Sequence, residues 1–172
     1  KVLQISIDTR FYKVKGANNE SIGEIVENLH QKVAPEIMFI PQLGLDRKHN
    51  LKQLLYEAEL LLETGCFKSI DLYGDELFGD INNFLPLYRK AKSKGLVLTA
   101  HAGEYGSAES VRTAVELLEL EQVQHGISAS ASAEVMRWLA NHKIILNVCP
   151  TSNVVLCRAE SIKKHPIRKL FD

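Results

Sequence analysis

Short apolar runs alternate with segments of helical periodicity along the chain. The runs that predict strands are residues 1–7, 37–40, 67–72, 96–100, 122–126 and 144–148. Between them, apolar residues recur at helical spacing, as in Ile22, Ile25, Val26, Leu29 and Val33. Such an alternation is typical of parallel strands joined by crossover helices.

Local signals mark the ends of several expected helices. Ser21 and Glu24 have the spacing of a capping box, and Asn50 can cap the helix that follows it. Gly65 and Gly95 come directly after helical segments, where glycine commonly ends a helix. These signals divide the chain into repeated units of one strand and one helix.

Polar residues follow the expected strands at the points where the strands end. They are Arg10, Arg47, Gly74, Asp75, His101, Glu104, His125, Ser152 and Asn153. In parallel α/β folds, ligands bind at the carboxyl ends of the strands. The pattern therefore predicts one site built from several strands.

The number of units limits the possible architectures. A closed barrel of eight strands and eight helices typically takes about 250 residues, and this sequence has 172. We therefore expect either an open six-stranded sheet or part of a barrel whose first and last units are absent from the sequence.

Composition narrows the class of protein. The chain has no net formal charge, and it is 45% hydrophobic and 24% charged, as in soluble globular proteins. No apolar run approaches the ~20 residues that cross a bilayer, and no signal-peptide pattern opens the chain. We expect a cytoplasmic protein that binds neither membranes nor nucleic acid. The three cysteines lack the spacing of a disulfide framework or a cysteine-rich zinc site.

The segment 96–104 carries the chemistry that narrows the function further. Its apolar run ends at His101, Gly103 permits a tight turn, and Glu104 follows; His125 ends the next expected strand. Two histidines and a glutamate at one edge suit a metal-activated water with acid–base assistance. The phosphate-binding and serine-hydrolase motifs G-x-x-x-x-G-K-[ST], G-x-G-x-x-G and G-x-S-x-G are absent. Metal-assisted hydrolysis is the reaction class that these residues favour.

Four ordered motifs carry a resemblance to a known family. They are Asp71-Leu72-Tyr73-Gly74-Asp75-Glu76, His101-Ala102-Gly103-Glu104, His125-Gly126 and Val148-Cys149-Pro150-Thr151-Ser152-Asn153. Together they resemble the adenosine deaminase family of zinc aminohydrolases, over essentially the whole chain. The resemblance implies a (β/α)8 TIM-type barrel, with residues 1–172 as a single incomplete (β/α) barrel domain that provides its second to seventh strands.

The resemblance also implies roles for individual residues. His101 would be a zinc ligand, and Glu104 would protonate the purine ring nitrogen beside the reacting carbon. His125 would deprotonate or electrostatically support the attacking water, and Gly74 would place its backbone N–H against the purine. Asp71 would support the metal site, although a cap at the strand end is an equally good interpretation. The implied reaction converts adenosine, or a closely related aminopurine nucleoside or base, to inosine or the corresponding product and ammonia, with Zn²⁺ as cofactor.

The sequence departs from the family pattern in two respects. The family binds zinc through an H-x-H pair, a later histidine and an aspartate after the eighth strand. None of the six histidines here forms an H-x-H pair, so we expect this chain to lack a complete metal site. Asn147 stands where many members have a glutamate that orients the histidine equivalent to His125. We expect Asn147 and Ser152 to support the catalytic groups, and the choice between adenosine, adenine and related purines stays open.

Two other functions remain open at this point. The chain could be a catalytically inactive, deaminase-like binding module, or an aminohydrolase whose substrate is not a purine. Among the remaining polar residues, we expect Arg10 and Arg47 to brace the rim through carboxylates. We expect Cys149 to be a small buried group and His165 to be a capping or surface residue.

Overall fold

The part of the chain that the structure describes forms a single parallel sheet of six strands, with helices between them. The computed structural model describes residues 1–13 and 21–171. Its strands are β1 (Val2–Asp8), β2 (Met38–Asp46), β3 (Ser69–Tyr73), β4 (Val97–Ala102), β5 (Gln122–His125) and β6 (Ile145–Asn147). Its α-helices are α1 (Ile22–Val33), α2 (Leu51–Glu63), α3 (Leu85–Ser93), α4 (Ala108–Leu118), α5 (Ala133–Asn141), α6 (Pro150–Val155) and α7 (Ile167–Phe171). Short 3-10 helices are η1 (Thr9–Lys13), η2 (Ile81–Phe84), η3 (Ile127–Ala131) and η4 (Ile162–Lys164).

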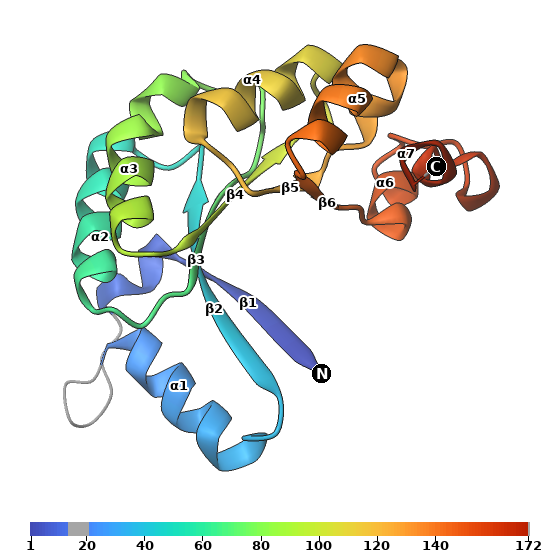
Figure 1. Ribbon diagram of the computed structural model, residues 1–172. Coiled ribbons are helices and arrows are strands. Elements are labelled where there is room, and N and C mark those ends of the chain that lie inside the picture. Colours follow the sequence, from blue (N-terminus) through green and yellow to red (C-terminus); the bar gives the residue numbers. More distant parts are fainter. Residues whose placement is uncertain (14–20, 172) are drawn as a thin grey trace.

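The sheet curls into part of a barrel. The spatial order of the strands is their order in the chain, β1 to β6, and every neighbouring pair is parallel. Helices α2 to α5 cover the convex side, while the concave side stays open (Figure 1). A doubly wound sheet would reverse its strand order at a switch point, so this order excludes it. The curled sheet confirms the partial-barrel expectation over a flat open sheet.

Alternation along the strands separates an apolar outer layer from a polar inner surface. Ile70 and Leu72 of β3 are fully buried in the core between sheet and helices. The intervening Asp71 lines the inner cavity together with His101 and Asn147. A strand points successive side chains to opposite faces, so one run of residues serves both the core and the site.

The observed elements follow the sequence pattern closely, with two differences. The capping box of Ser21 and Glu24 and the Asn50 cap are both present. Strand β2 extends to Asp46, well past the predicted end, because Pro41 to Leu45 are buried in the sheet and the strand pairs with β3 as far as Asp46. The helical segment expected before Gly95 is divided into η2 and α3, with a proline in the first turn of α3.

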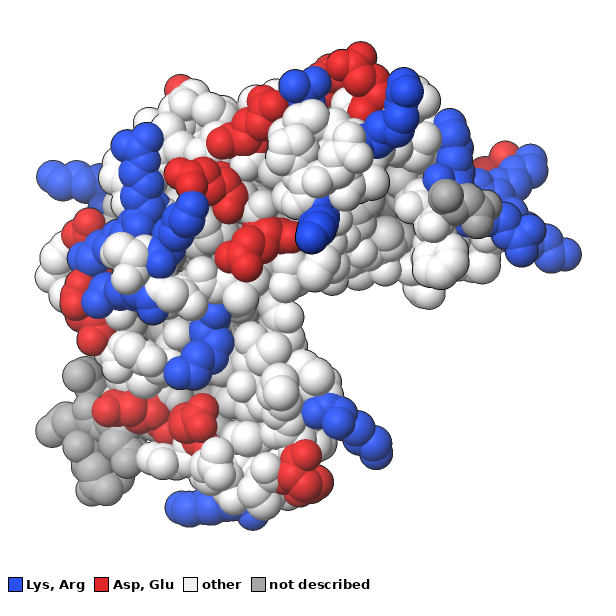
Figure 2. All heavy atoms as spheres, in the orientation of Figure 1, with Lys and Arg blue, Asp and Glu red and all other residues white. Residues whose placement is uncertain are grey.

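Charge is distributed over the outer surface without one dominant sign. Figure 2 shows acidic and basic side chains interspersed over the helical side, with uncharged groups along the concave edge. Within residues 1–13 and 21–171, no helix has the length and apolar character needed to cross a membrane.

Candidate active site

His101 is the penultimate residue of β4 and lies beside a buried carboxylate from the neighbouring strand. Its Nδ1 lies 3.0 Å from Oδ2 of Asp71, whose side chain is 3% exposed. Asp71 lies opposite Thr99 in the β3–β4 register, and Thr99 Oγ1 is 2.9 Å from Asp71 Oδ1. A buried carboxylate on Nδ1 orients the ring and leaves Nε2 as the nitrogen available to a ligand.

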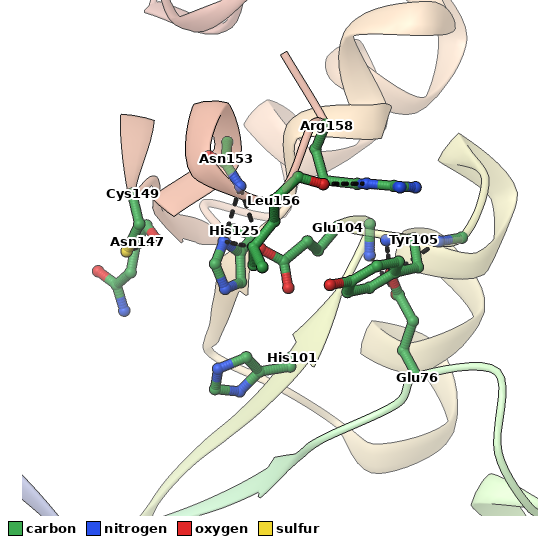
Figure 3. Close-up of polar contacts among 12 residues, drawn as sticks. Glu76, His101, Glu104, Tyr105, His125, Asn147, Cys149, Asn153, Leu156 and Arg158 are labelled. Atoms are coloured by element: carbon green, nitrogen blue, oxygen red, sulfur yellow. Dashed lines mark hydrogen bonds and ion pairs between the residues drawn. The ribbon is translucent and has the colours of Figure 1, made fainter. Parts of the chain in front are cut away.

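The loop after β4 turns sharply and presents Glu104. Gly103 has φ +73°, and a Cβ there would lie 2.4 Å from Val111 Cγ2, so only glycine fits without a shift. Glu76, from the loop after β3, accepts the backbone N–H groups of Gly103 at 2.5 Å and Gly106 at 2.7 Å, and also that of Tyr105. The turn is therefore fixed by a carboxylate from another loop (Figure 3).

His125 ends β5 in an unusual backbone conformation. Its φ is +68°, in the left-handed region that residues other than glycine rarely adopt, and its side chain is buried. Its ring centroid lies 5.2 Å from that of His101. Backbone strain of this kind often occurs at functional sites, where the surrounding structure holds the residue in place.

Glu104 and His125 form a close pair on the same side of the cavity. Oε1 of Glu104 is 3.3 Å from Nδ1 of His125. Burial raises the pKa of Glu104, and the negative charge of Glu76 acts in the same direction. Burial lowers the pKa of His125, as does the nearby His101. Both shifts favour the neutral forms, a carboxylic acid beside an uncharged imidazole.

Asn153 of α6 joins this pair from above. Its Nδ2 is 3.0 Å from His125 Nδ1 and 3.3 Å from Glu104 Oε1 (Figure 3). On its other side, Asn153 Oδ1 lies 3.2 Å from Nε2 of His165. Asn153 and His165 are both buried, so this part of the network is shielded from solvent.

One cavity brings most of the sequence-predicted residues together. A space of about 720 Å³ is lined by residues that include Gly74, His101, Glu104, His125 and Ser152. Asp71 and Asn147 line an adjoining space on the inner surface of the sheet, which His101 also borders. Asn147 donates a hydrogen bond to Gln122 Oε1 at 3.0 Å. Asn153 occupies the position beside His125 that the sequence suggested for residue 147.

The residues present fit part of a zinc site. His101 has a buried Nδ1 that lies 3.0 Å from Asp71 Oδ2 and has no other hydrogen-bond partner among the described residues, and metal-bound histidines commonly place this nitrogen beside a carboxylate. Structural and catalytic zinc sites use three or four protein ligands. Within the described ranges, no group of three or more histidine, cysteine or acidic side chains is arranged to hold a metal ion. His101 therefore suits one ligand position of a site that needs further ligands.

Three expectations about individual residues need correction. His165 does cap η4, and its Nδ1 accepts from the N–H of Ile167, but it is not a surface residue, because the chain after α6 folds back onto Asn153 and buries it. Cys149 is exposed, since β6 ends at Asn147 and leaves it in the connection to α6. Arg47 donates to the backbone carbonyls of Glu76 and His101 instead of to carboxylates. Arg10 does pair with a carboxylate, that of Asp8, at 2.8 Å.

Three residues of the site had no role in it that the sequence analysis predicted. Asn153 was placed at the correct edge, but nothing in its neighbours indicated a contact with His125. Glu76 is the last residue of the motif that begins at Asp71, but nothing along the sequence indicated its contact with the turn after β4. His165 carried no signal of its contact with Asn153, because it lies between η4 and α7 whereas Asn153 lies in α6.

A family model described as adenosine deaminase matches residues 39–172. A protein of Treponema pallidum, provisionally named adenosine/adenine deaminase, is 36% identical over 99% of this chain and 57% of its own length. An adenine deaminase from Arthrobacter aurescens is structurally similar, with TM-score 0.85, 25% identity, and coverage of 99% of this chain and 53% of that one.

A second solved structure, of an amidohydrolase from Burkhoderia ambifaria with bound Zn, has TM-score 0.81 at 22% identity. It covers 98% of this chain and 49% of that protein. The chain therefore spans about half the length of the relatives and structures it matches.

Proposed function

Because this chain belongs to the adenosine deaminase family, we propose that its protein hydrolyses adenosine or a closely related aminopurine and releases ammonia. The observation that carries this proposal is the arrangement of His101, Glu104 and His125 around one cavity. A glutamic acid and an imidazole at 3.3 Å, beside a histidine suited to a metal, are the groups that a hydrolytic deamination requires.

We propose that His101 binds zinc through Nε2, with Asp71 orienting its ring. A zinc ion bound there would lower the pKa of a water molecule to about 7 and so supply hydroxide at neutral pH. The remaining ligands would come from other parts of the protein. The Zn-containing neighbour from Burkhoderia ambifaria is compatible with this assignment through its shared fold.

Glu104 is the proton donor in this proposal. Burial raises the pKa of Glu104, which keeps a larger fraction of it protonated near neutral pH. A protonated carboxyl can donate to a purine ring nitrogen, which makes the adjacent carbon a better electrophile for water. The amine then leaves that carbon as ammonia, and the oxygen of water takes its place.

Gly74 and Ser152 border the same cavity and are proposed to contact the substrate or support the catalytic groups. Gly74 has φ +93°, so its N–H is presented by a turn that other residues adopt with strain. The missing side chain permits a planar base to approach the backbone. A purine nucleoside or base is the small-molecule partner that such a space would accept, and a cytoplasmic location is part of this proposal.

The test is the Glu104→Gln substitution in the full-length protein, with ammonia release measured from adenosine and from adenine. Glutamine keeps the shape but cannot donate an acidic proton, so we expect kcat to fall by about 100-fold or more. The control is Glu109→Gln on the exposed surface of α4, which should leave kcat unchanged. Near-normal deamination by the Glu104 variant would remove Glu104 as the donor. Purine binding by wild-type protein without turnover would favour a non-catalytic binding module.

A further inference from the structure

The donor and the acceptor in each hydrogen bond around Asn153 can be assigned in turn, starting from a backbone N–H group. The N–H of Ile167 donates to His165 Nδ1 at 3.1 Å. A backbone N–H can only donate, so His165 Nδ1 is unprotonated and its ring proton lies on Nε2. This Nε2–H then donates to Asn153 Oδ1 at 3.2 Å. The backbone amide of Ile167 thus fixes the tautomer of His165.

The same series of hydrogen bonds fixes the orientation of the Asn153 side-chain amide. If the amide were turned by half a rotation, its Nδ2 would face the Nε2–H of His165, and two donors would oppose each other inside the protein. Two further bonds hold the residue itself, because its backbone carbonyl accepts from Arg158 at 2.7 Å and Ala159 at 3.0 Å. Asn153 therefore directs its Nδ2, which can only donate hydrogen bonds, toward Glu104 and His125.

We propose that Asn153 is a positioning residue that holds His125 in the tautomer with its proton on Nε2. Asn153 Nδ2 is 3.0 Å from His125 Nδ1, so Nδ1 must be the acceptor. Nδ1 also lies 3.3 Å from Glu104 Oε1, but an unprotonated Nδ1 does not form an ion pair with that oxygen. Both atoms instead accept from the amide of Asn153 (Figure 3).

This tautomer assigns the chemical role of His125. With its proton on Nε2, the ring acts on the side away from Asn153 as a hydrogen-bond donor rather than as a base. His125 then stabilises negative charge on the attacking oxygen electrostatically. Because Oε1 of Glu104 accepts from Asn153, the acidic proton of Glu104 belongs on Oε2. This catalytic consequence rests on the proposed function, whereas the tautomer itself does not.

The first measurement is the tautomer of His125 by 15N–1H NMR in the full-length protein, with the signal assigned by its loss in a His125→Gln variant. We expect Nε2 to carry the proton and Nδ1 to be free of it. A protonated Nδ1 in the wild-type protein would overturn the proposal. A wild-type protein with the expected tautomer but no deaminase activity would refute the proposed function alone.

The Asn153→Asp substitution keeps almost the same side-chain shape but replaces the amide donor that faces His125 with a carboxylate acceptor. A carboxylate accepts from both rings, so the His125 proton should move to Nδ1. We expect kcat to fall by about 100-fold, with KM changed much less, because a wrong histidine tautomer leaves binding intact. The matched control is Asn141→Asp at the exposed end of α5, which should change neither the tautomer nor kcat. An unchanged tautomer in the Asn153 variant contradicts the proposal.

A second pair of variants tests whether His165 orients the Asn153 amide, without changing Asn153 itself. His165→Gln keeps a side-chain donor toward Asn153 Oδ1 and should preserve the His125 tautomer. His165→Leu removes that donor, so the Asn153 amide is free to rotate and both His125 tautomers should appear. Identical NMR spectra of His125 in the two variants would show that His165 does not orient Asn153.

Discussion

Glu76 and Gly103 are joined by a hydrogen bond of 2.5 Å between a carboxylate oxygen and a backbone N–H, although they belong to the loops after two different strands. The same carboxylate also accepts hydrogen bonds from the backbone N–H groups of Tyr105 and Gly106. The turn that presents Glu104 is therefore supported by a side chain from a different loop.

Replacing Glu76 with glutamine should destabilise the full-length protein by roughly 1–3 kcal/mol. Glutamine has one amide nitrogen and one oxygen, so in either orientation a donor would face a backbone donor of the turn. The free energy of unfolding in urea measures this loss. Glu59→Gln on the exposed face of α2 serves as the control and should change it by less than about 0.5 kcal/mol. Equal stability of the two variants would contradict the role given to Glu76.

The pKa of Glu104 predicts an effect of pH on stability. Its pKa is raised above the ordinary value of 4.5 by burial, so the folded protein binds this proton more tightly than the unfolded chain. The contribution is complete below 4.5 and is lost as pH rises through the higher folded pKa. Glu104→Gln removes this loss. We therefore expect the variant to gain stability relative to wild type as pH rises from acid to neutral, measured by urea unfolding. A difference independent of pH would disprove the raised pKa.

Replacing Asp71 with asparagine should weaken zinc binding by about 10–100-fold, because the ring of His101 loses the carboxylate that orients it. Competition with a chelator in the full-length protein measures this affinity. Asp80→Asn, which alters only the cap of η2, provides the comparison. If both variants bound zinc as wild type does, Asp71 would be a strand-end cap and nothing more.

Gly74 and Gly65 provide a matched pair of positions for separating the effect of backbone strain from the effect of contact with a substrate. Both have positive φ, +93° and +71°, so alanine should destabilise each by about 1–2 kcal/mol. A Cβ at Gly74 would lie 3.0 Å from Asp46 Oδ1 beside the cavity, whereas a Cβ at Gly65 meets no atom within 4 Å. We expect only Gly74→Ala to raise KM, by about tenfold. A similar KM in both variants would place the substrate elsewhere.

The sequence predicted the fold well because the fold depends on local patterns. Ile70 and Leu72 alternate with Asp71, and this alternation indicates both a strand and the face that each residue occupies. Strand β2 was predicted too short because burial between two neighbours, which extends it to Asp46, is a property of the assembled sheet.

The site was predicted in part for the same reason. His101, Glu104 and His125 could be placed together because each follows a strand end, and parallel strands end at one edge. The link from His165 through Asn153 to His125 joins three separate elements. No spacing along the chain encodes such a contact, so His165 looked like an ordinary polar residue near a proline.

The strand order also has a consequence for synthesis. Each strand pairs with the one that precedes it in the chain, so the sheet can grow in the order in which a ribosome releases it, at about 5–20 residues per second. His101 and Glu104 emerge before His125. Asn153 and His165, which contact each other and, through Asn153, His125, emerge after all three. In a nascent chain, Glu104 and His125 therefore lack the hydrogen bonds of Asn153 until α6 and the segment behind it have left the ribosome.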